Sequence, residues 1–196
     1  HNQMHDDGLN DMRRNIDAWW PAIEAGAEAI LINASGCGST VKEYAFHLQN
    51  DAQYAQKAQR VSELAKDIVE ILIGETEGLK ALFSLAPSAA TLAYHPPCSL
   101  QHGQKLGGKV ETLLSGLGYP VLLPKDSHLC CGSAGTYSFL QPELSGRLLQ
   151  NKVNNLEALQ PKAVLSGNIG CIAHIGSGTD IPVMRWIEYL DQPCGN

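Results

Sequence analysis

The segment Thr91-Leu92-Ala93-Tyr94-His95-Pro96-Pro97-Cys98 joins a short apolar run to two prolines and a cysteine. A continuous apolar run of this length that ends at prolines is typical of a buried strand. Two later runs stand in the same relation to cysteines: residues 120–123 precede Cys130-Cys131-Gly132, and residues 163–165 precede Cys171. Parallel strands of one sheet present their carboxyl ends at the same edge. The pattern therefore predicts a parallel sheet with a group of thiols at that edge.

Helical patterns separate the apolar runs along the whole chain. Alternation of strands with helices indicates an α/β fold with a mainly parallel sheet. A linker is expected over residues 74–90, which hold Gly74, Gly78 and Pro87. The predicted helices cover residues 9–25, 39–48, 57–73, 101–116, 142–158 and 186–190. A further strand is predicted at residues 29–32, and a turn is predicted at residues 33–38 directly after it.

The strand-and-cysteine pattern occurs twice. The run at 29–31 leads to Ser35-Gly36-Cys37, the run at 163–165 leads to Ile169-Gly170-Cys171, and the offset is 134 residues in both cases. This repeat predicts two related cysteine-rich modules, each a small, mainly parallel sheet flanked by helices. Residues 1–86 hold the first module and the linker, and residues 87–196 hold the second. A cysteine pair equivalent to Cys130-Cys131 would fall ahead of residue 1, so we expect the first module to be truncated at its amino end.

Composition excludes several classes of protein. The 196 residues carry a net charge of −6, so no basic stripe is present to neutralise nucleic-acid phosphates. No apolar run approaches the ~18–20 residues that cross a bilayer, and no signal segment opens the chain. We therefore expect a cytoplasmic protein without a nucleic-acid partner, for which peripheral association at the inner face of the cytoplasmic membrane stays open.

The cysteines are too few for a disulfide scaffold and are placed as metal ligands would be. There are six in 196 residues, whereas small secreted scaffolds are far denser. Cys98, Cys130, Cys131 and Cys171 form a candidate soft-metal site for zinc or an iron–sulfur cluster. Adjacent thiolates seldom both reach one small Zn²⁺ ion, so the Cys130-Cys131 pair favours a cluster. Buried apolar cysteines and a Cys130–Cys131 disulfide switch are the alternatives.

Other candidate residues are weaker. Cys37 is a candidate ligand of an incomplete site in the first module, whereas Cys194 lies in a terminal tail and is expected to be incidental. Four histidines near the cysteines are expected to form hydrogen bonds that tune a cluster, with His174 as the best candidate for a fifth ligand. These histidines are His95, His102, His128 and His174.

These residues resemble the cysteine-rich CCG domain. That domain occurs, usually in tandem, in heterodisulfide reductase subunits and in iron–sulfur subunits of respiratory 2-hydroxyacid dehydrogenases. The chain is most similar to the carboxyl-terminal half of glycolate oxidase iron–sulfur subunits, and the resemblance covers essentially its whole length. The stretches that carry it are Asn15-Ile16-Asp17-Ala18-Trp19-Trp20, Ser35-Gly36-Cys37-Gly38, Val41-Lys42-Glu43-Tyr44, Ser99-Leu100-Gln101-His102, Asp126-Ser127-His128-Leu129-Cys130-Cys131-Gly132-Ser133-Ala134-Gly135-Thr136-Tyr137 and Asn168-Ile169-Gly170-Cys171.

The resemblance implies an electron-transfer subunit of an oxidoreductase. Such a subunit takes electrons from partner flavin subunits that oxidise glycolate and passes them toward the membrane quinone pool, so no catalytic acid, base or nucleophile is expected here. Asn168 stands where the wider family often has a fifth cysteine, as does Ala34 in the first module. Four cysteines suffice for a cubane [4Fe–4S] cluster. The alternatives are heterodisulfide-reductase-like, lactate or glycerol-3-phosphate dehydrogenase subunits, or a zinc-stapled module that only mediates assembly.

Overall fold

A computed structural model of the chain describes residues 5–82 and 91–191. The chain divides into two compact units, His1–Ile68 and Val69–Asn196. The boundary that the sequence predicts, between residues 86 and 87, lies outside the described residues. Each unit contains its own parallel strand pairing, so the α/β class predicted from the sequence is confirmed.

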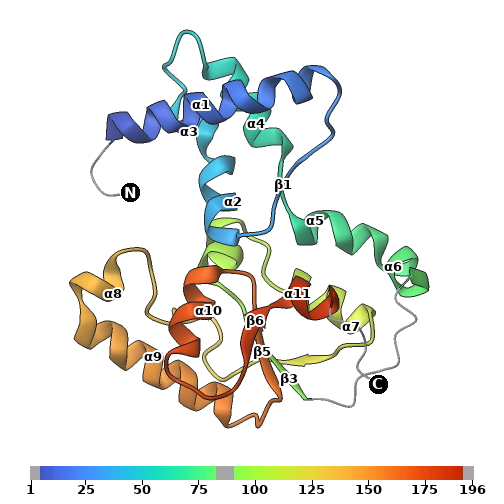
Figure 1. Cartoon of the computed structure of the whole chain (residues 1–196), viewed down its shortest axis with the longest axis vertical. Helices are drawn as coiled ribbons and strands as arrows, with labels where there is room; N and C mark the ends of the chain where they lie inside the picture. The colour runs from blue at the N-terminus through green and yellow to red at the C-terminus, as the bar shows by residue number, and fades with distance from the viewer. Residues whose placement is uncertain (1–4, 83–90, 192–196) are drawn as a thin grey trace. The chain divides into compact units, whose positions relative to one another are not determined.

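The second unit is built on a four-stranded parallel sheet (Figure 1). Its strands are β3 (Leu92–His95), β4 (Val121–Leu122), β5 (Ala163–Ser166) and β6 (Val183–Arg185), in the order β4-β3-β5-β6. The two central strands pair over their full length, with Leu92 opposite Ala163 and His95 opposite Ser166. Every residue of β3 and β5 is buried, as expected for strands covered on both faces. Because the last residues of β3 and β5 are paired, the carboxyl ends of both strands lie side by side at one edge of the sheet.

Helices cover both faces of this sheet. An apolar cluster joins Val153 and Leu156 of α9 (Pro142–Glu157) and Ile175 of α10 (Ile169–Gly176) to Ala93 and Val164 of the strands. The helices α7 (Lys109–Gly116) and α11 (Trp186–Asp191) lie on the other side in Figure 1. The helix α5 (Ile68–Leu72) begins at the last residue of the first unit and continues into the second. The remaining elements of the second unit are η1 (Ile73–Glu75), α6 (Thr76–Leu82), η2 (Ser99–Gly103) and α8 (Tyr137–Leu140).

The predicted helix over residues 101–116 is two separate elements. The π-helical turn η2 ends at Gly103, and α7 begins only at Lys109. Between them Lys105 has a φ of 58° and Gly108 a φ of 82°, both left-handed conformations that cannot continue a right-handed helix. The predicted single helix over 101–116 is therefore wrong at residues 104–108.

The first unit has a two-stranded parallel sheet, in which β1 (Ile30–Ile32) pairs with β2 (Ala65–Asp67). Helices α1 (His5–Glu24), α2 (Ser35–Lys42), α3 (Tyr44–His47) and α4 (Ala55–Leu64) surround it. Its core cluster contains Ile16, Val41, Tyr44, Leu48, Ala58, Val61 and Ala65. Arg13 binds Asp51 across this unit, with 2.8 Å between its Nη2 and the carboxylate Oδ2.

Two sequence predictions fail in the first unit. The helix predicted over 57–73 is interrupted because β2 supplies the backbone hydrogen bonds that β1 needs. The turn predicted over residues 33–38 is mostly helical, since α2 already begins at Ser35. None of the helices in residues 5–82 and 91–191 combines the length and apolar character required to cross a bilayer.

Replacing Leu165 by alanine tests the importance of the central strand pairing. Leu165 is fully buried in β5, so Leu165→Ala is expected to lower the free energy of unfolding of the second unit by about 2–5 kcal/mol. Leu122→Ala, in the edge strand β4 where the side chain is 46% exposed, is the matched control and should cost far less. Urea unfolding followed by circular dichroism measures both, and equal losses would contradict this arrangement.

Candidate metal centre

Four thiols converge at the carboxyl edge of the four-stranded sheet. Cys98 follows β3 and caps η2, Cys130 and Cys131 lie in the loop after β4, and Cys171 lies in the first turn of α10 after β5. Hydrogen bonds link Cys98 to Cys130, Cys130 to Cys131, and Cys131 to Cys171. The structure thus brings together the four cysteines that the sequence placed at this edge.

The burial of the thiols changes across the group. Cys131 and Cys171 are buried and belong to the apolar cluster of α9, α10 and the strands. Cys98 and Cys130 are partly exposed. One side of the group is therefore sealed in the core and the other side opens toward solvent.

The hydrogen bonds divide the four thiols into donors and acceptors. The pKa of Cys130 is lowered far below the usual thiol value because its sulfur accepts hydrogen bonds from Cys131 and Cys98. The pKa of Cys171 is lowered to about 5, first by a hydrogen bond from Cys131 and further by His95, against the opposing effect of burial. The same hydrogen bonds, together with burial, raise the pKa values of Cys131 and Cys98. A metal bound by all four sulfurs must displace the protons on Cys98 and Cys131.

A histidine completes the buried side of the group. His95 is the last residue of β3 and is fully buried. Its ligand nitrogen and the sulfurs of Cys131 and Cys171 all lie within 4.8 Å of one another. Neither ring nitrogen makes a well-aligned hydrogen bond to a described residue, and the nearest group is the Cys171 thiol, whose pKa the ring lowers. A buried, unpaired imidazole costs free energy, and a metal bound beside the thiols would remove that cost.

Gly132 fixes the backbone directly after the cysteine pair. Its φ of 101° is left-handed, and a Cβ there would lie 2.5 Å from the carbonyl oxygen of Ser145. Its N–H donates to Cys130 Sγ at 3.3 Å, and its carbonyl oxygen accepts a hydrogen bond from Ser145 Oγ at 2.9 Å. Ser145 Oγ also lies 3.2 Å from His174 Nε2. This glycine therefore lets the cysteine loop pack closely against α9 and α10.

Asn168 positions Cys171 through the start of α10. Its Oδ1 accepts hydrogen bonds from the N–H groups of Gly170 at 2.9 Å and Cys171 at 3.4 Å, which makes it the N-cap of the helix. Its Nδ2 donates to Ser99 Oγ at 3.3 Å. Asn168 thus ties the turn that carries Cys171 to the turn that follows Cys98.

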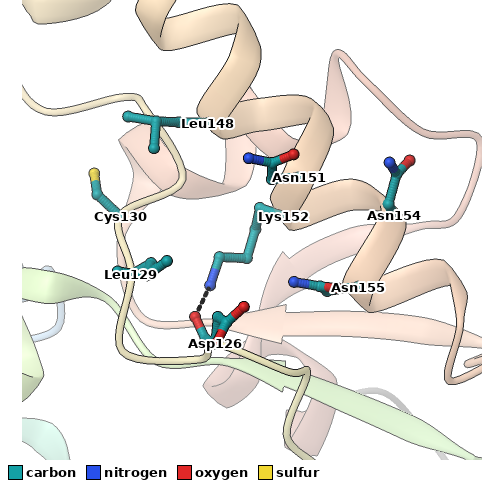
Figure 2. A pocket seen from close by; sticks show the side chains of 8 residues that line it. All are labelled: Asp126, Leu129, Cys130, Leu148, Asn151, Lys152, Asn154 and Asn155. Carbon is teal, nitrogen blue, oxygen red and sulfur yellow. Dashed lines mark hydrogen bonds between the residues drawn. The ribbon is translucent and has the colours of Figure 1, made fainter.

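Lys152 holds the loop that leads to the cysteine pair. It projects from α9, is only 2% exposed, and donates from Nζ to the carbonyl oxygen of Asp126 at 2.8 Å (Figure 2). The carbonyl oxygen of Ser127 lies 3.5 Å from the same nitrogen. Burial lowers the pKa of Lys152. Lys152 and Cys130 also line a pocket of about 320 Å³.

The other candidate residues do not belong to the compact donor group of His95, Cys131 and Cys171. Cys37 is exposed on α2 in the first unit, and residues 1–68 contain no second cysteine. Cys194 lies outside the described residues. His102 is exposed, with Nε2 3.3 Å from the carbonyl oxygen of His128. The nitrogen donor beside the thiols is His95, whereas His174 is engaged by Ser145.

Two supporting residues could not be singled out from the sequence. Lys152 follows the polar pattern of an ordinary exposed helix position, and Ser145 lies in the same helix with no local motif. The position of His95, three residues before Cys98, was the one available signal for its role.

The donor set fits a soft metal or an iron–sulfur cluster. Thiolates and imidazole bind both zinc and iron, and the buried nitrogens of His95, which make no well-aligned hydrogen bond, fit such a ligand set. Cys98, Cys130, Cys131, Cys171 and His95 are the residues that could hold it.

Comparison with protein families supports this assignment. The model of the cysteine-rich CCG domain matches residues 92–176, from the first residue of β3 to the last of α10. The match covers the whole segment that carries the metal centre. All four clustered cysteines and His95 lie within it.

Curated relatives extend the similarity over nearly the whole chain. The glycolate oxidase iron-sulfur subunit of Escherichia coli (strain K12) is 52% identical over 192 residues, which are 98% of this chain and 46% of that subunit. A probable glycolate oxidase iron-sulfur subunit of Bacillus subtilis (strain 168) is 26% identical over 92% of this chain and 40% of its own length. Lactate utilization protein A of Geobacillus thermodenitrificans (strain NG80-2) is 27% identical over 85% of this chain and 71% of its own length. The chain thus spans less than half of each glycolate oxidase subunit, and the resemblance noted from the motifs is confirmed.

Substitution of Gly132 tests the packing of the cysteine loop. Gly132→Ala places a Cβ against the Ser145 carbonyl in a left-handed conformation, so the free energy of unfolding should fall by about 2–3 kcal/mol. Gly146→Ala is the control, because nothing lies within 4 Å of its added Cβ and alanine favours helix. Thermal unfolding compares the two, and a Gly132→Ala protein as stable as the control would contradict the packing seen here.

Removal of the Lys152 charge tests its hold on the loop. Lys152→Met keeps most of the side-chain volume but loses the hydrogen bonds to the carbonyls of Asp126 and Ser127. We expect a loss of about 1–3 kcal/mol in stability and faster amide exchange over residues 126–131. Lys125→Met, at an exposed position of the same loop, is the control. Unchanged exchange in Lys152→Met would show that the lysine does not hold the loop.

Proposed function

We propose that the chain is an iron–sulfur electron-transfer subunit of an oxidoreductase that acts on glycolate. The convergence of Cys98, Cys130, Cys131 and Cys171 at one sheet edge of a CCG domain is the observation that carries the proposal. Its 52% identity to a glycolate oxidase iron-sulfur subunit supports the choice of substrate. The similarity to lactate utilization protein A of Geobacillus thermodenitrificans is weaker, at 27% identity.

The four cysteines would hold a [4Fe–4S] cluster. When bound, such a cluster stores and releases one electron at a time. The buried pair Cys131 and Cys171 would keep water from the inner side, while Cys98 and Cys130 lie on the side nearer solvent. Lys152 and Asn168 would keep the loops and the helix turn that bear the thiolates in place.

Substrate oxidation is assigned to partner subunits. A 2-hydroxy acid loses two electrons and two protons on oxidation, which a flavin can accept together and pass on singly. We propose flavin-binding glycolate oxidase subunits as the electron donors and the membrane quinone pool as the destination, reached by peripheral association. No residue of this chain is assigned as a catalytic acid, base or nucleophile. Cys37 is proposed as one ligand of a separate cluster, which needs thiols that residues 1–68 do not supply.

Anaerobic reconstitution with iron and sulfide tests the proposed function. The protein should bind about four irons and four sulfides and give the electron paramagnetic resonance signal of a reduced cluster. Cys130→Ser and Cys131→Ser should abolish that signal because each removes a ligand. Cys37→Ser and Cys194→Ser are the matched controls and should keep it. Retention of zinc with no stable iron would favour a structural assembly module instead.

A further inference from the structure

His95 belongs to the metal centre but has no role in a cluster held by the four cysteines alone. It ends β3 with its backbone fixed by parallel pairing to Ser166, whose hydroxyl donates to the His95 carbonyl oxygen at 2.9 Å. Its side chain is fully buried. Neither ring nitrogen makes a well-aligned hydrogen bond to a described residue, although the ring lies close enough to Cys171 to lower the pKa of that thiol. Buried polar side chains are normally paired, so this imidazole is placed for a partner of another kind.

The immediate surroundings of His95 define that partner. The sulfurs of Cys131 and Cys171 and a ring nitrogen of His95 lie within 4.8 Å of one another. These three donors come from separate segments, the end of β3, the loop after β4 and the first turn of α10. A neutral imidazole has one nitrogen with a free lone pair, which is a good ligand for iron or zinc. The three donor atoms therefore lie close enough together to bind one metal-containing group.

We propose that His95 is a protein ligand of the cluster that Cys131 and Cys171 help to hold. The inference rests on the proposed function for the identity of the group as an iron–sulfur cluster. Replacement of thiolate by neutral imidazole in an iron–sulfur ligand set raises the reduction potential. His95 would thus be a fifth protein donor to the cluster, held in place by β3, and one iron would carry it in addition to a thiolate. Because imidazole is neutral, it would leave the cluster a better electron acceptor than a thiolate at the same position would.

The other histidines near the cysteines do not have this environment. His174 Nε2 is 3.2 Å from Ser145 Oγ, and His102 Nε2 is 3.3 Å from the carbonyl oxygen of His128. His102 and His128 are also exposed to solvent. Among the described histidines, His95 alone shares a compact donor group with two cysteines.

Isotope labelling of the unmodified full chain tests the proposal without a mutation. The protein is prepared with ¹⁴N- or ¹⁵N-labelled histidine, reconstituted with iron and sulfide, reduced, and examined by electron spin echo envelope modulation. We expect the strong nitrogen coupling of a directly bound imidazole, which changes with the label. A cluster signal with no such coupling, or with only the weak coupling of an N–H···S hydrogen bond, would overturn ligation by His95 and leave the proposed function standing.

Variants assign the coupling to one of the seven histidines. His95→Phe should lose it, whereas the exposed control His102→Gln should keep it. His95→Cys should retain iron but have a lower midpoint potential than the unmodified protein, because a thiolate is anionic. Persistence of the coupling in His95→Phe would overturn the proposal. Failure of the unmodified protein to bind iron and sulfide would overturn the proposed function as well, and metal analysis separates that result from the others.

Discussion

The parallel pairing of β3 with β5 is the constraint on which the metal centre depends. Because His95 lies opposite Ser166 in that pairing, the segments that follow both strands leave the sheet at one edge. Cys98 comes three residues after β3 and Cys171 five residues after β5, and the pairing of β4 beside β3 directs the Cys130-Cys131 loop to the same place. Cysteines up to 73 positions apart in the sequence thus form one group of donors. An antiparallel partner strand would send one of these segments to the opposite edge.

The surroundings of the thiols explain how a small domain can hold such a group. Cys131 and Cys171 lie in the same apolar cluster as Val153, Val164 and Ile175, so the fold buries them as it would any small apolar side chain. Burial alone would leave His95 unpaired and the sulfurs sharing protons among themselves. Metal binding would satisfy these donors together, and it therefore couples occupancy of the site to the stability of the fold.

The sequence predicted the parts of this arrangement that depend on local pattern. Apolar runs before Cys98, Cys130 and Cys171 were sufficient to predict a parallel sheet and a shared edge, because parallel strands have their carboxyl ends at the same edge of a sheet. The strand β2 was missed because Ala65–Asp67 has no strand pattern of its own and forms only by pairing with β1. The break at Lys105–Gly108 depends on backbone angles that no periodicity reveals. Lys152 and Ser145 could not be found either, since their roles come from contacts between α9 and loops far away in the sequence.

The identity of the bound group is the central claim, and X-ray absorption at the iron and zinc edges of anaerobically purified protein tests it most directly. The account predicts iron whose scattering contains sulfur neighbours and a distinct iron–iron path, since neighbouring irons occur only in a cluster. The iron–iron path should disappear in Cys131→Ser. A spectrum dominated by zinc, with sulfur and nitrogen neighbours and no metal–metal path, would contradict the electron-transfer account and identify the site as a structural metal centre.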